Sequence, residues 1–96
     1  MKVVFSDEAD SDLLQILTYL AARNRVAAVA LANIFNTKIE SLAHFPFIGR
    51  GRSHFARGLR SAVVENHVIF YRVERERILI VRVLDGRRDI EAEFER

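Results

Sequence analysis

The side chains with the clearest chemistry in this 96-residue chain are arginines that gather in its middle. The stretch from Ser41 to Val64 has no Asp or Glu, and it carries Arg50, Arg52, Arg57, Arg60, His44 and His54. Arginine presents a planar fork of five donors that suits phosphate and carboxylate groups, and it enters interfaces readily. The pattern predicts contact with an acidic macromolecule, either protein or nucleic acid, with a solvated basic loop as the alternative.

His54 allows a catalytic interpretation of the same loop. Cleavage of RNA without a metal needs a base for the 2′-hydroxyl proton, an acid for the leaving oxygen, and cations on the phosphate. The residues that could provide this are His54, Arg52, Arg57 and Arg60. A surface histidine beside solvated arginines is the simpler interpretation, because the sequence does not give the geometry that proton transfer requires.

The sequence indicates no metal or cofactor site. Its three histidines lack the spacing of metal ligands and it has no cysteine, so neither an imidazole cluster nor a thiolate site is predicted. It also lacks a P-loop, a dinucleotide-binding glycine pattern and a Gly-x-Ser-x-Gly elbow. We expect no metal, no cofactor and no small-molecule substrate.

A second group of arginines lies near the C-terminus. The pair Asp85-Gly86 precedes two of them and suits a tight turn with a positive φ at the glycine. Arginine and aromatic residues dominate interface energies. The candidate target-binding residues are therefore Arg82, Arg87, Arg88 and Phe94. A local ion pair between Asp89 and one of these arginines is the alternative.

Helical periodicity marks the first half of the chain. A short alternating strand from Lys2 to Phe5 precedes Ser6, which can cap a helix, and Asn24 is a second candidate cap. The apolar residues that recur at helical spacing after these caps are Ala9, Leu13, Ile16, Leu17 and Leu20, then Leu31, Ile34, Phe35, Ile39 and Leu42. They predict a helical hairpin that ends near residue 43, before a loop from Pro46 to about Gly58.

The second half changes to the pattern of strands. Leu59 to Glu65, Val68 to Val73 and Ile78 to Leu84 are rich in Val and Ile and are separated by polar segments of turn length. We expect a small antiparallel sheet with the helical hairpin on one face, in the order β-α-α-β-β-β. The fold class is α+β, and residues 1–96 form a single domain.

The other face of this sheet is predicted to dock a partner. The hairpin can cover only one face, and the second face is apolar among its arginines instead of polar. The residues assigned to this docking surface are Arg60, Val64, Val68, Phe70, Arg72, Ile78 and Ile80. The alternative is that the short acidic C-terminal segment folds back over the face.

No apolar segment approaches the length of a signal peptide or membrane span, so we expect a cytoplasmic protein with no membrane partner.

Five motifs along nearly the whole chain resemble those of ParE-type toxins in the ParE/RelE superfamily. In order, they are Phe5-Ser6-Asp7-Glu8-Ala9, then Phe45-Pro46-Phe47-Ile48-Gly49-Arg50, Leu59-Arg60, Val68-Ile69-Phe70-Tyr71-Arg72-Val73 and finally the segment from Ile80 to Asp89. Each motif alone is weak, but five in this order and at matching intervals form a strong set. The expected element order agrees with the fold of that superfamily.

The resemblance implies a function and partners. ParE-like proteins are the toxins of type II toxin–antitoxin pairs, and a ParD-like antitoxin wraps them with a flexible C-terminal segment. Characterised ParE toxins poison DNA gyrase, whereas RelE toxins cut messenger RNA on the ribosome. We therefore expect a gyrase inhibitor that acts by binding, neutralised by a ParD-like antitoxin and in contact with operator DNA only through that antitoxin.

Two features of the sequence leave alternatives to this expectation open: the residue at the place of the RelE-type tyrosine, and the residue at position 85. Many RelE-type enzymes carry a tyrosine near the C-terminus, where this chain has Phe94, and its own Tyr19 and Tyr71 are expected to pack in the core. The alternative function is a RelE-type ribosome-dependent endoribonuclease that uses His54. The ParE family commonly has His where this chain has Asp85, so a third possibility is a toxin of low potency that serves in an autoregulatory complex with its antitoxin.

Overall fold

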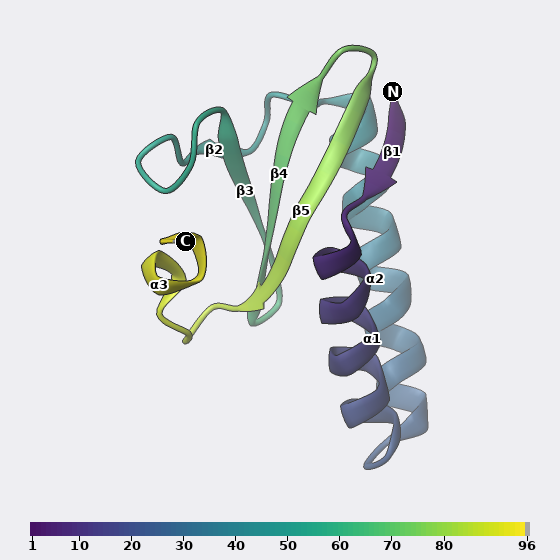
Figure 1. The fold of residues 1–96 in the computed structure, drawn as a ribbon. Coiled ribbons are helices and arrows are strands. Elements are labelled where there is room, and N and C mark those ends of the chain that lie inside the picture. Colours follow the sequence, from purple (N-terminus) through teal and green to yellow (C-terminus); the bar gives the residue numbers. More distant parts are fainter. Residues whose placement is uncertain (96) are drawn as a thin grey trace.

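The computed structural model describes residues 1–95 and has two layers, a helical hairpin and a twisted sheet (Figure 1). The elements in chain order are β1 (Lys2–Phe5), α1 (Asp7–Ala21), α2 (Arg25–His44), β2 (Arg50–Gly51), β3 (Leu59–Val64), β4 (His67–Glu74), β5 (Arg77–Asp85) and α3 (Ile90–Phe94). The α+β class and the expected element order are confirmed. The structure adds the two-residue β2 inside the expected loop and the short C-terminal α3. No helix within residues 1–95 is long and apolar enough to cross a membrane.

The strands form one sheet in the order β1-β5-β4-β3-β2. The three long strands are antiparallel neighbours, as expected, but β1 pairs in parallel with β5, from Lys2 opposite Arg77 to Phe5 opposite Ile80. A parallel neighbour requires a long crossover, and here the connection contains the hairpin of α1 and α2 followed by β2, β3 and β4. The N-terminus and the last strand therefore lie side by side (Figure 1).

Both long helices begin where the sequence predicts a cap. The Ser6 hydroxyl accepts a hydrogen bond from Ala9 N–H at 3.0 Å, and the Asn24 side chain accepts one from Ala27 N–H at 3.0 Å. These caps satisfy donors that the first turn of a helix leaves free. The first turn of α1 also holds Asp7, Glu8 and Asp10, whose negative charge the helix dipole favours.

The main core lies between the hairpin and one face of the sheet. Its fully or nearly buried helical residues are Ala9, Phe35, Ile39 and Leu42, and its strand residues are Val64, Ile69, Tyr71, Ile78, Ile80 and Val83. The expected packing of Tyr71 against the helices is confirmed. The same expectation is wrong for Tyr19, which is 64% exposed at the surface of α1 with the Arg23 guanidinium over its ring. The predicted docking surface is wrong for Val64, Ile78 and Ile80, because these side chains point into this core.

Two features of the sheet explain that error. Register places Arg60 opposite Tyr71 and Ala62 opposite Ile69, so Arg60, Ala62 and Val64 share the hairpin face, opposite to the expected assignment. A β-bulge lies in β5, since Phe70 pairs with Arg82 and Tyr71 with Ile80. The bulge reverses the alternation of β5, so Ile80 and Val83 both enter the main core.

The opposite face of the sheet is covered rather than bare. A second apolar cluster forms around Leu59, Phe70 and Leu84, each with 1% of its surface exposed. Phe94 of α3 lies on it, with ring centroids 5.1 Å from Phe70 and 6.0 Å from Phe55. The C-terminal segment therefore does fold back over this face, and α3 lies on the side away from the hairpin (Figure 1).

Burial predicts which leucines of the hairpin matter for stability. Leu42 is completely buried and Leu14 is 68% exposed. We expect Leu42→Ala to lower the free energy of unfolding by about 2–5 kcal/mol because it leaves a cavity, and Leu14→Ala to change it by less than about 0.5 kcal/mol. Urea unfolding of both variants measures the difference, and equal losses would contradict the placement of the core.

Candidate target-binding surface

The turn after β5 presents Arg87 and Arg88 to solvent, with 88% and 53% of their side-chain surface exposed. The Asp85 carboxylate accepts a hydrogen bond from Arg87 N–H at 2.9 Å, and Gly86 N–H donates to the Asn66 carbonyl at 2.8 Å. These contacts fix the direction in which both arginines leave the sheet.

The expected positive φ at Gly86 is wrong. Among residues 1–95, Gly58 is the glycine with a positive φ. Gly86 instead allows a close approach of two backbone segments, because a Cβ there would lie 3.3 Å from the Asn66 carbonyl oxygen. Asp85, and not the expected Asp89, supplies the local ion pair, at 3.0 Å from Arg87. Asp89 caps α3 by accepting from Ala92 N–H.

A cavity of about 450 Å³ opens beside this turn, between the hairpin and the end of β5. Ile16, Leu31 and Val83 contribute apolar surface. The polar lining includes His67, Arg87 and Arg88, together with the carboxylates of Asp12 and Asp85, which are already paired with Arg82 and Arg87. His67 Nδ1 is buried and has no hydrogen-bond partner within the described part of the chain. The place combines apolar surface with two projecting cations, which suits a protein side chain that ends in a carboxylate.

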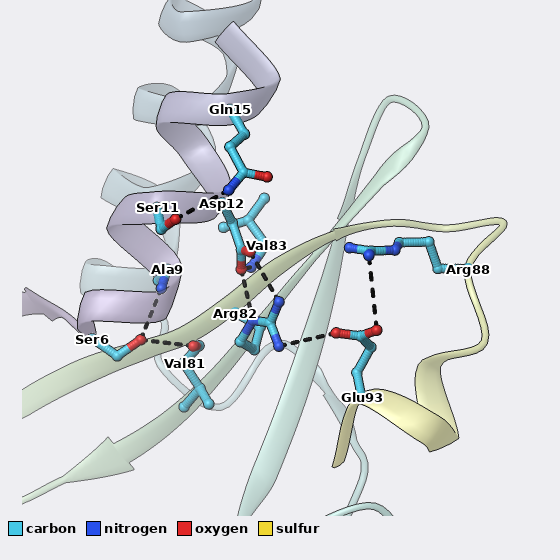
Figure 2. A network of polar contacts seen from close by, with 10 residues as sticks. All are labelled: Ser6, Ala9, Ser11, Asp12, Gln15, Val81, Arg82, Val83, Arg88 and Glu93. Carbon is cyan, nitrogen blue, oxygen red and sulfur yellow. Dashed lines mark hydrogen bonds and ion pairs between the residues drawn. The ribbon is translucent and has the colours of Figure 1, made fainter. Parts of the chain in front are cut away.

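Arg82 has a different environment from the other two arginines. It donates to both oxygens of Asp12 at 2.8 and 3.0 Å, and to Glu93 at 3.1 Å (Figure 2). Hydrogen bonding to Asp12 raises the pKa of Arg82 above its ordinary value. The structure thus joins Arg82 to α1 and α3 and does not bring it to the exposed surface with Arg87 and Arg88. Phe94, which packs against Phe55 and Phe70, is likewise occupied within the fold.

The predicted docking face retains only part of its set as accessible side chains. Val64, Ile78 and Ile80 are in the main core, and Phe70 lies under α3. Arg60, Val68 and Arg72 are partly exposed. The assignment failed for two reasons: Val64, Ile78 and Ile80 lie on the hairpin face, and α3 covers Phe70 on the opposite face.

The arginine loop does not assemble its residues around His54. Arg52 donates to the Ser61 hydroxyl at 2.9 Å, and Arg60 donates to the carbonyls of Phe47 and Gly49. The His54 ring lies 4.1 Å from the ring of Phe55, and both His54 and Arg57 are exposed. Burial, followed by repulsion from Arg50, lowers the pKa of Arg52 below its ordinary value.

Comparisons with known proteins agree with this architecture. Residues 3–90 match the family model described as the ParE toxin of the type II toxin–antitoxin system parDE. The chain belongs to the ParE toxin family. It is 31% identical over 94 residues to Toxin ParE3 of Caulobacter vibrioides, an alignment that covers 97% of this chain and 94% of that protein. A structure titled "Chromosomal ParDE TA system from P. aeruginosa" shares the fold, with a TM-score of 0.75 and 20% identity over 88% of this chain and 95% of that one.

Sequence reasoning missed the role of Asp12 in this ParE-family chain. Asp12 accepts from Arg82 and also from Val83 N–H at 2.9 Å. Its position was the available signal, since it falls three residues after Ala9 and four before Ile16, within the apolar face of α1. An acid in such a face needs a buried partner.

A double-mutant cycle tests the Asp12–Arg82 contact. Both side chains are mostly buried, at 11% and 16% exposed. We expect Arg82→Met to cost about 1–3 kcal/mol of folding free energy because Asp12 loses its charged donor. Asp12→Leu in the same chain should recover part of that loss, giving a coupling energy of about 1 kcal/mol or more. Additive losses in urea unfolding would show that the two residues act independently.

The Asp85–Arg87 contact predicts an abnormal titration. Hydrogen bonds from the Arg87 side chain and backbone lower the pKa of the Asp85 carboxyl from 3.8 to about 2. Because the pKa is depressed, the pairing is complete above pH 3.8 and is lost as the pH falls through about 2. Arg87→Ala should raise the Asp85 pKa towards its ordinary value, and Arg75→Ala, an exposed change in the β4–β5 turn, should not. Carboxyl ¹³C shifts followed by NMR measure both, and an unmoved pKa in Arg87→Ala would refute the contact.

Proposed function

We propose that this ParE toxin inhibits DNA gyrase by binding it through Arg87 and Arg88, and that a ParD-like antitoxin neutralises it. The observation that supports the target site is the hydrogen-bonded turn after β5. This turn holds two arginines in solvent beside a cavity that has apolar surface. Rigid presentation of this kind reduces the ordering cost of binding. No step of covalent chemistry is assigned to the chain in this proposal.

Family membership supports the partner. The matching model describes toxins of type II toxin–antitoxin systems, and the P. aeruginosa neighbour is a ParDE system. We propose that the antitoxin occupies the partly exposed positions Val68 and Arg72 of the predicted docking set, and that operator DNA is contacted only through the antitoxin. Arg60 is left out of this proposal because it lies on the hairpin face and bonds to the loop before β2. Val64, Ile78 and Ile80 are left out of this proposal because they lie in the core.

In this proposal, the aspartate at position 85 changes how strongly the toxin inhibits its target, and it leaves the location of the target-binding site unchanged. Asp85 pairs with Arg87 through both the side chain and the backbone. The pair leaves the guanidinium exposed, so its remaining donors can reach a carboxylate of the target. Asp85 therefore orients Arg87 while reducing the net charge of the turn.

A supercoiling assay tests the function. The purified chain should inhibit supercoiling by gyrase or trap its cleaved complex, and the ParD-like protein encoded beside it should restore activity. Arg87→Ala/Arg88→Ala should weaken inhibition by about 30-fold or more, as expected for loss of two interface arginines of about 1–2 kcal/mol each. Thermal stability should stay nearly unchanged, since both side chains are exposed.

Two outcomes would reject the proposal. Full inhibition by the double variant would remove Arg87 and Arg88 from the site. Cleavage of ribosome-bound messenger RNA that disappears in His54→Ala would instead support the endoribonuclease, because His54 has no role in a gyrase inhibitor that acts by binding. Arg57→Ala, in the same exposed loop, is the matched control for the histidine variant.

A further inference from the structure

The loop between α2 and β2 is held rigidly by two side chains. The hydroxyl of the fully buried Tyr71 donates to the Pro46 carbonyl at 2.9 Å and accepts from Gly49 N–H at 2.9 Å. Arg60 donates to the carbonyls of Phe47 at 3.2 Å and Gly49 at 2.9 Å. Four backbone polar groups over four residues are thus fixed to the sheet.

Gly49 makes this attachment possible. A Cβ at this position would collide with the Tyr71 hydroxyl and ring, so a larger residue would displace the loop from its anchor. Ile48 N–H also bonds to the Phe45 carbonyl at 3.1 Å, which closes the turn. The loop conformation is therefore determined by the sheet beneath it and does not depend on a partner.

The side chains that this rigid loop carries face water. Phe45, Phe47 and Ile48 are 64%, 65% and 66% exposed. We call residues 45–48 the apolar knob. The Arg60 guanidinium lies 5.0 Å from the centre of the Phe47 ring and supports its orientation. Exposed large apolar groups that are grouped and preorganised are typical of interface anchors.

The segment of chain that contains the knob carries basic side chains and no acidic ones. No Asp or Glu occurs between Ser41 and Val64, and the exposed Arg50 follows the knob after Gly49. Within residues 1–95, the carboxylates pair with Arg77, Arg82, Arg87 and Arg88, and none pairs with Arg50. A complementary surface would therefore be an apolar pocket with carboxylates at its rim.

We propose that the apolar knob inserts into such a pocket on the folded target protein of the toxin. A convex, preorganised element fits a preformed concavity, whereas a flexible antitoxin segment gains most by folding into a groove. The knob lies at the end of the sheet away from the turn that carries Arg87 and Arg88 (Figure 1). It thus adds a second, separate contact, and it rests on the proposed function in taking the inhibited protein as its partner.

A pair of matched double variants tests the knob. Phe45→Ser/Phe47→Ser removes two exposed rings, and Val26→Ser/Val29→Ser removes two exposed valines of α2, which are 81% and 59% exposed. Inhibition of gyrase by the phenylalanine variant should weaken by about 10-fold or more, because buried aromatic anchors are frequent hot spots of interfaces. The valine variant should inhibit like the parent, and both should keep the parent's melting temperature and affinity for the antitoxin.

A charge-reversal variant tests the carboxylates that we propose at the rim of the target's pocket. Arg50→Glu should weaken inhibition at low salt, and the difference from the parent should shrink as ionic strength rises, because screening removes exposed charge effects. Three results would overturn the proposal: parent-like inhibition by the phenylalanine variant, a loss of antitoxin affinity with inhibition intact, and a loss of binding to naked DNA with binding to gyrase intact. The second result would show that the knob binds the antitoxin, and the third that it binds nucleic acid.

Growth arrest separates this proposal from the gyrase assignment. If the parent chain arrests growth without inhibiting gyrase, the proposed function fails, and the knob is then judged by whether its variant still arrests growth at equal expression. Growth arrest by that variant would reject the knob under either target. A parent chain that neither arrests growth nor inhibits gyrase rejects both.

Discussion

The contact of Asp12 with Arg82 joins helix α1 to strand β5, and through Arg82 it also joins both to helix α3. Strand β1 ends at Phe5, so the edge of β5 beyond Ile80 has no strand beside it. Helix α1 takes over that edge: the Ser6 hydroxyl donates to the Val81 carbonyl, and the Asp12 carboxylate accepts from Val83 N–H and from the Arg82 side chain (Figure 2). Side chains of a helix thus satisfy strand groups that would otherwise be open to another chain. Because Arg82 also bonds to Glu93, the same guanidinium positions α3.

The position of α3 determines which surfaces remain for partners. Glu93 accepts from Arg82 and lies 3.9 Å from Arg88, while Phe94 covers Phe70. The acids of the C-terminal segment therefore serve partly as counter-ions for the sheet, and its aromatic residue completes an apolar cluster. The Arg87–Arg88 pair remains exposed at one end of the sheet and the apolar knob at the other.

Much of the architecture could be predicted from sequence because local signals were consistent. The caps at Ser6 and Asn24, the apolar stripe through Leu42 and the polar breaks between strands all specify elements directly. The two faces of the sheet could not be assigned in this way. Strand β3 is apolar or small at most positions on both faces, so alternation does not fix its orientation. The bulge in β5 adds one residue whose effect on the pattern is invisible without the partner strand. The exposure of Phe45 and Phe47 could not be predicted either. A hydrophobic run beside a proline gives no sign that Tyr71, which is distant in the sequence, bonds to the loop backbone and leaves these rings in solvent.

The parallel pairing of β1 with β5 also constrains the order in which the molecule can assemble. Lys2 through Phe5 are made before every other element of the fold, and their partners Arg77 through Ile80 follow some 75 positions later. Helix hairpins form from local contacts and are fast, whereas distant strand pairing carries a large loop-closure cost and comes late. The hairpin can therefore be present on a growing chain, but neither the cavity nor the Arg87–Arg88 turn exists until translation has passed β5. A ribosome that stalls or terminates before β5 is complete releases a fragment with an incomplete sheet and without this turn. If Arg87 and Arg88 bind the target as proposed, such a fragment lacks that contact, which leaves the synthesis of the first four strands as an interval in which an antitoxin can be waiting.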